Sequence, residues 1–207
     1  FRRVLFRSLM GWVYKKETVD GGTTRYMYNR SGKVTMEQDA DAATGSTLHV
    51  RLFDYNNFGD IILQKRATLS TGSFDTYTSR NSYQWLFRHS NTGFANCISN
   101  FVNEKEWHYG NSIDIANTTY HNRTKQYLIR SRTNMKGALS HTVSYDNAGQ
   151  PVLYNFFSYN NEGQLKWEIQ QFNQQGINES AKGLLVRIDY PEYNLRGSLI
   201  TKNIDVN

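Results

Sequence analysis

The sequence predicts an all-β fold in which antiparallel β-hairpin repeats form one extended, curved sheet. Three observations carry this prediction. The composition combines 14 tyrosines and 11 phenylalanines with only two prolines, and aromatic side chains suit the half-buried surface of a sheet. A short word, aromatic–Asp/Asn–x–x–Gly, recurs along the chain. The segments beside this word alternate apolar and polar residues, which indicates strands with one buried face.

The recurring word has the chemistry of a hairpin turn. An Asp or Asn at the first corner of a type I turn can bond to the backbone ahead of it, and the Gly three positions later supplies the positive φ from which the return strand starts. This is the three-residue hairpin loop with a bulge. The aromatic residue is then the last residue of the incoming strand. The predicted structural turn residues are Tyr28, Asn29 and Gly32; Tyr55, Asn56 and Gly59; Tyr145, Asp146 and Gly149; Tyr159, Asn160 and Gly163; Phe172, Asn173 and Gly176; and Tyr193, Asn194 and Gly197.

The segments that flank these turns are predicted strands. Residues 141–145 (HTVSY), 164–170 (QLKWEIQ) and 183–190 (GLLVRIDY) place apolar side chains at every second position. In the last of them, the apolar face is expected to contain Leu184, Val186, Ile188 and Tyr190. Phe172 breaks the parity of the strand before it, which predicts a bulge nearby. Each turn aromatic is expected to pack on its neighbour across the strands. An aliphatic residue usually follows the turn, as at Val34, Ile61, Leu165 and Leu199.

Residues 67–140 lack the word and separate two parts of the chain that contain it, 9–66 and 141–207. Within this gap, YQWLF alternates like a strand, whereas FANCISNFVNEKEW fits a helical face about as well as two strands. We expect strands to resume at TKQYLIRSR. The gap therefore consists either of degenerate hairpin repeats, which we favour, or of an insertion.

The two ends of the chain have their own signals. The first eight residues, FRRVLFRS (1–8), resemble translated sequencing adapter, and we set them aside from the fold. The formal net charge is +6, and Arg2, Arg3 and Arg7 supply half of it. The remaining charge is ordinary and does not favour a nucleic-acid partner. No apolar run approaches the ~18 residues of a membrane span, so we expect none. The closing residues, SLITKNIDVN, stop in a predicted strand, so we expect the repeats to be truncated there.

A nucleophilic site is the first chemical possibility to weigh. Cys97 stands between His89 and His108 in the sequence, and such residues could form a nucleophile and its base. A single Cys beside Ile98 and Phe101 is more typical of a small buried hydrophobe. The single Cys also excludes an internal disulfide framework.

Other catalytic signals are equally weak. Glu104, Glu106 and Asp114 could pair as glycosidase carboxylates, but Glu-Lys-Glu is more typical of a solvated face. The sequence contains no Gly-rich phosphate loop, no G-x-S-x-G elbow and no Cys/His cluster with zinc spacing. We therefore expect no enzyme activity, no catalytic residues, no cofactor and no metal site.

The word in its setting of alternating strands resembles the YD repeats of the Rhs family, which includes bacterial Rhs shells, the cocoon-forming subunits of Tc toxins and, more distantly, the teneurins. The closing segment RIDYPEYNLRGSLITKNIDVN looks like stretches of these proteins, and the resemblance covers Thr24–Arg66 and His141–Asn207. It implies a slice of a larger shell, a structural scaffold that encloses or presents a toxin or effector or forms a cell-surface structure. The implied partners are further repeats of the same parent chain and an enclosed toxin or effector segment. The implied location is bacterial, secreted or at the cell surface.

The chain departs from the family pattern at the turns. Asn replaces Asp in five of the six words, and the Arg that often follows the Gly is absent. The family's core motif, its autoproteolytic aspartyl site and a C-terminal toxin have no match in the sequence. Processing and cargo are therefore not carried over from the resemblance.

A carbohydrate-binding or cell-wall-binding module of aromatic hairpin repeats is the alternative, with a cell-surface glycan as its partner. Such modules place aromatics before a similar turn, and Trp85, Trp107 and Trp167 could stack on sugars. Against this reading, those repeats are regular in period and usually start with Gly-Trp. In this sequence the only Gly-Trp is Gly11-Trp12.

Overall fold

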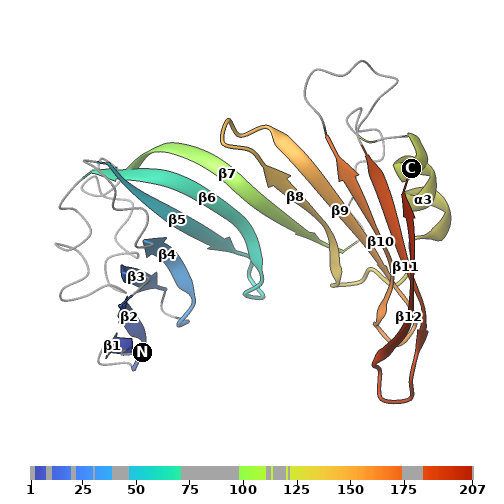
Figure 1. Ribbon diagram of the computed structural model, residues 1–207, viewed down its shortest axis with the longest axis horizontal. Coiled ribbons are helices and arrows are strands. Elements are labelled where there is room, and N and C mark those ends of the chain that lie inside the picture. The colour runs from blue at the N-terminus through green and yellow to red at the C-terminus, as the bar shows by residue number, and fades with distance from the viewer. Residues whose placement is uncertain are drawn as a thin grey trace. The chain divides into compact units, whose positions relative to one another are not determined.

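The computed structural model describes residues 3–7, 11–19, 22–29, 31–38, 47–70, 98–110, 113, 120, 122–173 and 184–206. Over these residues the chain is an antiparallel sheet with one short helix (Figure 1). The strands pair in chain order, from β1 (Arg3–Arg7) to β12 (Leu199–Val206). The prediction of an all-β fold made of antiparallel hairpins is confirmed.

The chain divides into two compact units, Phe1–Glu104 and Lys105–Asn207, called unit 1 and unit 2 below. Unit 1 contains β1, β2 (Val13–Thr18), β3 (Gly22–Tyr28), β4 (Val34–Gln38), β5 (Thr47–Tyr55), β6 (Ile61–Ser70) and the first part of β7 (Ile98–Tyr109). Unit 2 contains the rest of β7, α3 (Asn122–Ser131), β8 (Leu139–Tyr145), β9 (Pro151–Tyr159), β10 (Leu165–Phe172), β11 (Leu185–Tyr193) and β12.

Two of these strands lie in segments that the sequence left undecided or set aside. From Ile98 onward, the segment that fitted either a helix or two strands is the single strand β7. Within the eight N-terminal residues that we set aside, Arg3–Arg7 form β1 and pair with β2. The predicted strand YQWLF lies outside the described residues.

The buried face of unit 1 is built from residues that pair across neighbouring strands. Met27 on β3 lies opposite Met36 on β4, and both side chains are fully buried. Val50 on β5 lies opposite Ala67 on β6, and both are also buried. Because burying a Met or Val side chain stabilises the fold by roughly 1.5–3 kcal/mol, these pairs fix the register of the strands.

The core of unit 2 is built from alternating residues on β9 and β10, and for β10 this alternation was predicted. Every second residue of both strands is buried from Tyr154 on β9 and from Trp167 on β10. Phe156 lies opposite Ile169 on one side and His141 on the other. One face of the sheet in unit 2 is therefore an apolar layer.

Two details of the predicted strands in unit 2 differ from the structure. On β11 the buried side chains include Leu185, whereas Leu184 is exposed, because Leu185 joins the core cluster of the apolar layer. The bulge expected near Phe172 is absent from β10, which pairs regularly with β9 from Trp167 to Phe172. Phe172 therefore lies on the opposite face of the sheet, and the register shift lies between Leu165 and Trp167 instead.

Helix α3 corrects the strand that we predicted at TKQYLIRSR. Its most buried residues, Thr124 and Leu128, are four positions apart, and Ile129 is 66% exposed, which is the periodicity of a helix. The segment contains good helix formers, but its three consecutive apolar residues suit a strand equally well. Packing decides the outcome, because the helix brings Leu128 into the core cluster around Phe156.

Candidate functional site: the ladder of hairpin turns

In five of the six predicted turns the aromatic residue, the Asn or Asp and the Gly are all described, and these turns share one geometry. In the first of them, the backbone N–H of Asn29 donates to the carbonyl oxygen of Lys33 over 2.9 Å, and the N–H of Gly32 donates to that of Asn29 over 3.1 Å. The strands then shift register, so that Tyr28 lies opposite Val34. The same features recur at the other four turns, and the φ angles of the five glycines lie between 76° and 88°. A backbone in this region favours Gly.

One side-chain oxygen in each of these turns satisfies two backbone donors. Asn160 Oδ1 accepts hydrogen bonds from the N–H groups two and four residues ahead, over 3.1 and 2.9 Å. Asp146 Oδ1 accepts the equivalent pair, each over 2.8 Å. Asn29, Asn56 and Asn194 do the same. Because the turn uses only this oxygen, Asn can replace Asp without loss of these bonds.

Tyr145 forms a hydrogen bond with Glu106, but the tyrosine before each of the other four turns makes a bond that the sequence pattern did not predict. Its hydroxyl donates to the backbone carbonyl of the first residue of the preceding strand, and we call this set of four bonds the hydroxyl ladder. Tyr55 donates to Val34 over 2.6 Å. The other three bonds run from Tyr28 to Val13 over 2.7 Å, from Tyr159 to Leu139 over 2.9 Å and from Tyr193 to Leu165 over 2.5 Å. The preference for Tyr over Phe in the word is the signal that could have revealed the ladder.

The four ladder hydroxyls remain protonated donors. Burial is the main cause that raises the pKa of Tyr28, Tyr55, Tyr159 and Tyr193 above its ordinary value. A Tyr with a raised pKa keeps its proton through the physiological range. The ladder is therefore a fixed structural feature at neutral pH.

The residue after a turn glycine lies against the glycine of a later turn in the same unit. A Cβ placed on Gly32 would meet the Trp12 ring at 3.1 Å, and one on Gly197 would meet the Gln164 amide nitrogen at 3.2 Å. At Gly32, Gly59 and Gly197 a side chain would therefore be crowded as well as strained by φ, whereas a Cβ on Gly163 would meet nothing within 4 Å. The three contacts of this kind are Trp12 on Gly32, Lys33 on Gly59, where Lys33 Nζ also donates to the glycine carbonyl, and Gln164 on Gly197. Trp12 follows Gly11, which is outside the six words but has a positive φ of 80° like the turn glycines.

The fifth word makes the inter-strand bond with a different group. Phe172 has no hydroxyl, and the next residue, Asn173, takes over the role. Its side-chain amide donates to the carbonyl of Pro151, the first residue of β9, over 3.4 Å, and its N–H donates to Val152 over 2.8 Å. Gly176 lies outside the described residues.

The β7–β8 connection follows the same turn rule, with extra residues placed inside it. Tyr109 lies opposite Leu139 across a register shift, as a turn aromatic does. The N–H of Gly110 donates to Ala138 over 2.9 Å, and Gly137 has a φ of 71°. These residues occupy the positions of the aromatic, the Asn or Asp, and the Gly of the word. The residues between Gly110 and Gly137, which include α3, are called the insertion below.

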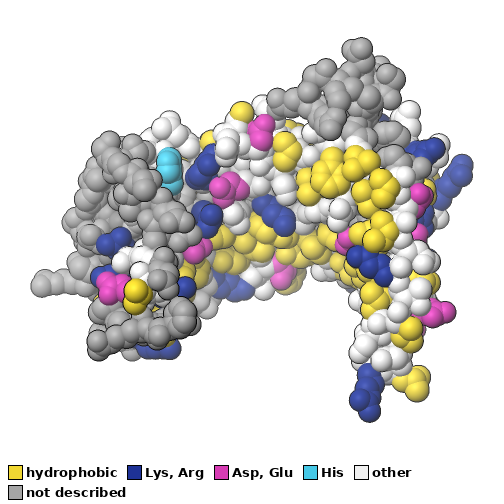
Figure 2. Space-filling view, viewed as in Figure 1, with side chains coloured by type: hydrophobic (Ala, Val, Ile, Leu, Met, Phe, Trp, Pro, Cys, Tyr) yellow, Lys and Arg dark blue, Asp and Glu magenta, His cyan; other side chains and the backbone are white. Residues whose placement is uncertain are grey.

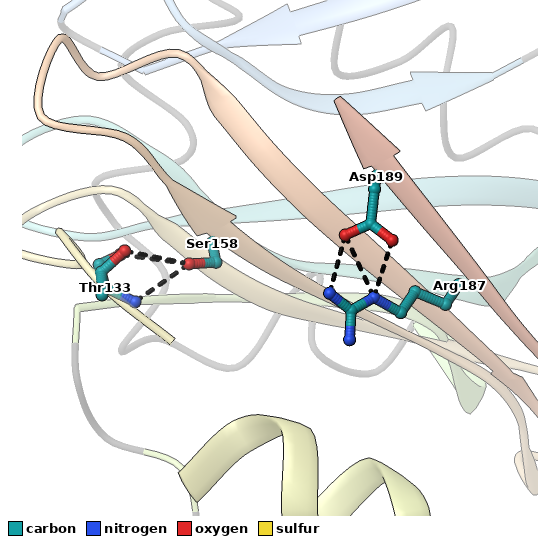
Figure 3. A network of polar contacts seen from close by, with 4 residues as sticks. All are labelled: Thr133, Ser158, Arg187 and Asp189. Atoms are coloured by element: carbon teal, nitrogen blue, oxygen red, sulfur yellow. Dashed lines mark hydrogen bonds and ion pairs between the residues drawn. The ribbon is translucent and has the colours of Figure 1, made fainter. Parts of the chain in front are cut away.

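Polar contacts fasten the described part of the insertion to the apolar layer of unit 2. The N–H of Thr133 donates to Ser158 Oγ over 2.9 Å, and Thr133 Oγ1 donates to the carbonyl of Tyr159 over 2.8 Å. Figure 3 shows Thr133 and Ser158 pointing toward each other. On α3, Thr124 Oγ1 donates to Gln171 Oε1 over 3.0 Å, and both side chains are fully buried. The described part of the insertion is therefore bound to this sheet by hydrogen bonds, one of them fully buried, as well as by apolar contact.

An ion pair on β11 adds a further contact to α3. Arg187 binds Asp189 through two nitrogens, with its shortest bond at 2.7 Å (Figure 3). The same guanidinium lies 4.4 Å from the centre of the Tyr127 ring, which is a cation–π distance. The hydrogen bond to Asp189 is the main cause that raises the pKa of Arg187. This cluster is typical of structural packing, because each charged group has a neutralising or aromatic partner.

Two histidines that flank the insertion in the sequence stack on each other. The rings of His108 and His141 lie 4.2 Å apart with 1° between their planes, and His141 Nδ1 lies 3.1 Å from Ser140 Oγ. Burial, together with the nearby His108, lowers the pKa of His141 to about 3. His141 is thus neutral at physiological pH. Glu106 contacts His108 Nε2 over 3.2 Å. Burial, with a hydrogen bond to Glu106, raises the pKa of Tyr145.

Two of the residues that could have carried chemistry, Glu104 and Trp167, make structural contacts. Glu104 bonds with Gln64 over 2.8 Å and pairs with Arg51 at 3.6 Å. Trp167 is 1% exposed and belongs to the core of unit 2. The described residues hold no group of three metal-ligating side chains, and none of their helices is long and apolar enough to cross a membrane. Cys97, His89, Asp114 and Trp85 lie outside the described residues.

The fold of this chain is similar to part of a solved structure. No protein-family model matches the chain, and no curated protein matches it. It is similar to the crystal structure of TcdB2-TccC3, with a TM-score of 0.52 and 11% identity over 98% of this chain. The Tc holotoxin pore of Photorhabdus luminescens aligns with a TM-score of 0.48 and 11% identity over 99% of this chain. The chain spans only 8% and 9% of those two chains. The first likeness shows that this chain has a fold found within TcdB2-TccC3, in agreement with the resemblance of its repeat words to the Rhs family.

Proposed function

We propose that this chain is a non-enzymatic wall segment of an Rhs-like shell. The observation that carries the proposal is the hydroxyl ladder. A hairpin on its own is marginal in water, and the ladder ties four of the described hairpins to the strand before them. Tyr55, for example, bonds to Val34 on a strand outside its own hairpin. The unit of stability is thus the stack of hairpins, as in other repeat architectures.

The mechanism under this proposal is mechanical. The turn oxygens and glycines close the hairpins, the buried cross-strand pairs set their register, and the ladder joins four of them to the preceding strand. These features give a stiff sheet, and none of them requires a reactive group. The likeness to TcdB2-TccC3 supports the proposal at the level of the fold.

The whole assembly is also part of the proposal. Because the chain spans 8% of the TcdB2-TccC3 chain, we propose that further repeats of the parent chain continue the wall. The wall encloses or presents a toxin or effector segment in a secreted bacterial complex. A cell-surface structure is the form that the same wall would take without a cargo.

The structure does not favour the glycan-binding alternative. Of the tryptophans that could stack on a sugar, Trp167 is only 1% exposed. Trp107 is half-buried, and the ammonium of Lys105 lies 5.2 Å from the centre of its ring. Neither side chain offers the open, paired platform that sugar stacking requires.

Resistance of an enclosed segment to protease, measured in the full-length protein, tests the wall proposal. We expect a protected segment that is released only when the shell is opened. Gly163→Val, which strains a turn, is expected to increase its digestion, whereas Cys97→Ser serves as the control and is expected to leave it unchanged. A second arm incubates the purified chain with peptidoglycan and soluble glycans. The wall proposal fails if no segment is protected and if a glycan binds specifically until Trp107→Ala removes that binding.

A further inference from the structure

The outer edge of β12 combines exposure with an apolar sequence. In the pairing order of the described strands, β12 comes last and pairs with β11. Seven of its eight residues are exposed, and they include Leu199, Ile200, Ile204 and Val206. Figure 2 shows hydrophobic side chains at the surface of the β11–β12 hairpin, low in the view. Its charged residues are only Lys202 and Asp205, so this edge has little of the charge that usually protects an edge strand from pairing.

The hydroxyl ladder identifies which carbonyl of an edge strand a tyrosine hydroxyl would bind. Every ladder acceptor is the first residue of a strand and lies opposite the last residue of the strand before it. Val34 lies opposite Tyr28 and accepts from Tyr55, and Leu165 lies opposite Tyr159 and accepts from Tyr193. Val13, Leu139 and Pro151 obey the same rule, with Asn173 as the donor to Pro151.

Leu199 holds the same position on β12. It is the first residue of the strand and lies opposite Tyr193. Because the backbone groups of a strand point alternately to its two edges, the carbonyl of Leu199 is directed as those of Val34 and Leu165 are, away from the strand that pairs with it. Among the described residues, no hydroxyl donates to this carbonyl.

The contact between turns gives a second position at which the β12 edge can be compared with the other turns. In three turns the residue after one turn glycine lies against the glycine of a later turn, as Gln164 does on Gly197. Ser198 follows Gly197 and occupies the place of Gln164. A short side chain at this position leaves room for the next turn to approach.

We propose that the β12 edge is a docking site for a β-hairpin whose first strand ends in Tyr followed by Asn/Asp-x-x-Gly. The inference rests on the wall function proposed above and specifies how one hairpin attaches to the next. The incoming strand pairs with β12, its tyrosine hydroxyl donates to the carbonyl of Leu199, and its turn glycine lies beside Ser198. A second copy of β12 is a poorer occupant, because the strand LITKNIDV has no tyrosine to supply the hydroxyl.

A hairpin peptide copied from this chain tests this attachment. The probe spans Thr47–Ser70, which includes the strand that ends in Tyr55 and its turn. Thr47 and Ser70, which pair in the chain, are both changed to Cys and joined by a disulfide that holds the hairpin closed. The matched control peptide carries Tyr55→Phe. Binding is followed by fluorescence anisotropy of the labelled peptide and by amide hydrogen exchange of the full chain.

The expected result is saturable binding that slows exchange in residues 200–205. Loss of one neutral hydrogen bond, about 0.5–1.5 kcal/mol, is expected to make the Tyr55→Phe peptide bind roughly 2- to 10-fold more weakly. Ile204→Pro in the chain places a proline where the backbone of β12 faces its outer edge and is expected to abolish binding, with the circular dichroism spectrum retained. Equal binding by the two peptides, or protection away from β12, overturns the inference. A protected cargo in the parent protein would then still support the wall, so the two failures are distinguishable.

Discussion

Replacing Asn160 by Ala tests the turn chemistry at the tip of the β9–β10 hairpin. Asn160 Oδ1 accepts from two backbone N–H groups, those of Glu162 and Gln164, and Asn160 Nδ2 donates to Gln164 Oε1 over 2.8 Å. Ala removes all three bonds. The two backbone donors then depend on water, and the four-residue turn loses the side chain that holds it in a type I conformation.

The magnitude follows from the exposure of these partners. Each net hydrogen bond contributes about 0.5–1.5 kcal/mol to stability, and the partially exposed N–H groups regain part of this from water. We therefore expect Asn160→Ala to lower the free energy of unfolding of unit 2 by about 1–2 kcal/mol. A domain of this size then melts roughly 4–8 °C lower for each kcal/mol.

Thermal unfolding followed by tryptophan fluorescence measures this loss, because the buried Trp167 reports on unit 2. Asn160→Asp is the matched control, since Asp146 holds its turn through the same oxygen. The control is expected to stay close to the parent chain. If Asp destabilises unit 2 as much as Ala does, or if Ala has no effect, the two-donor account of the turn is wrong.

The remaining predictions concern a glycine, a histidine and the insertion. Gly163→Val forces a β-branched residue to a φ of 79° and is expected to lower the stability of unit 2 by at least the roughly 1–2 kcal/mol of a left-handed residue, measured by urea unfolding. Gly163→Asn should cost less, and an equal loss for both would contradict the strain argument. The folded pKa of His141 lies near 3, below its usual 6.5, so the unfolded chain takes up this proton first on acidification. The contribution of neutral His141 to the stability of the folded chain is present above about pH 7 and declines as the pH falls from about 6.5 toward 3. Unfolding measured across this range should show a shallower loss for His141→Gln and an unchanged one for the exposed control His49→Gln; parallel losses in all three chains would refute the assignment. Replacing residues 110–137 by the turn Asn-Asn-Glu-Gly should keep the β7–β8 pairing while acrylamide quenches Trp167 more strongly, and a loss of that pairing by hydrogen exchange would show that the insertion is not confined to a turn.

Local chemistry in the sequence was sufficient to predict the hairpin turns. Asp or Asn followed three residues later by Gly encodes a turn by itself, because the side-chain oxygen and the positive φ act within five residues. The alternation around Trp167 likewise predicted that Trp167 and Ile169 share the buried face of β10, whereas Leu165, which was expected with them, is only half-buried. The functional residues that sequence reasoning missed are acceptors, such as Val34 and Leu165, because a backbone carbonyl leaves no mark on residue identity.

The sequence by itself determined the fold class, the places of the turns and the absence of the familiar catalytic motifs, since each of these depends on neighbouring residues. Only the tertiary structure decided that residues 124–131 form a helix, because three apolar residues in a row fit either periodicity until Leu128 meets the core. It also decided that the β7–β8 connection is a turn with an insertion, since Gly110 and Gly137 lie far apart in the chain. The hydroxyl ladder is also decided only by the tertiary structure. It joins residues 15 to 28 positions apart, and only the pairing of strands brings each hydroxyl to its carbonyl.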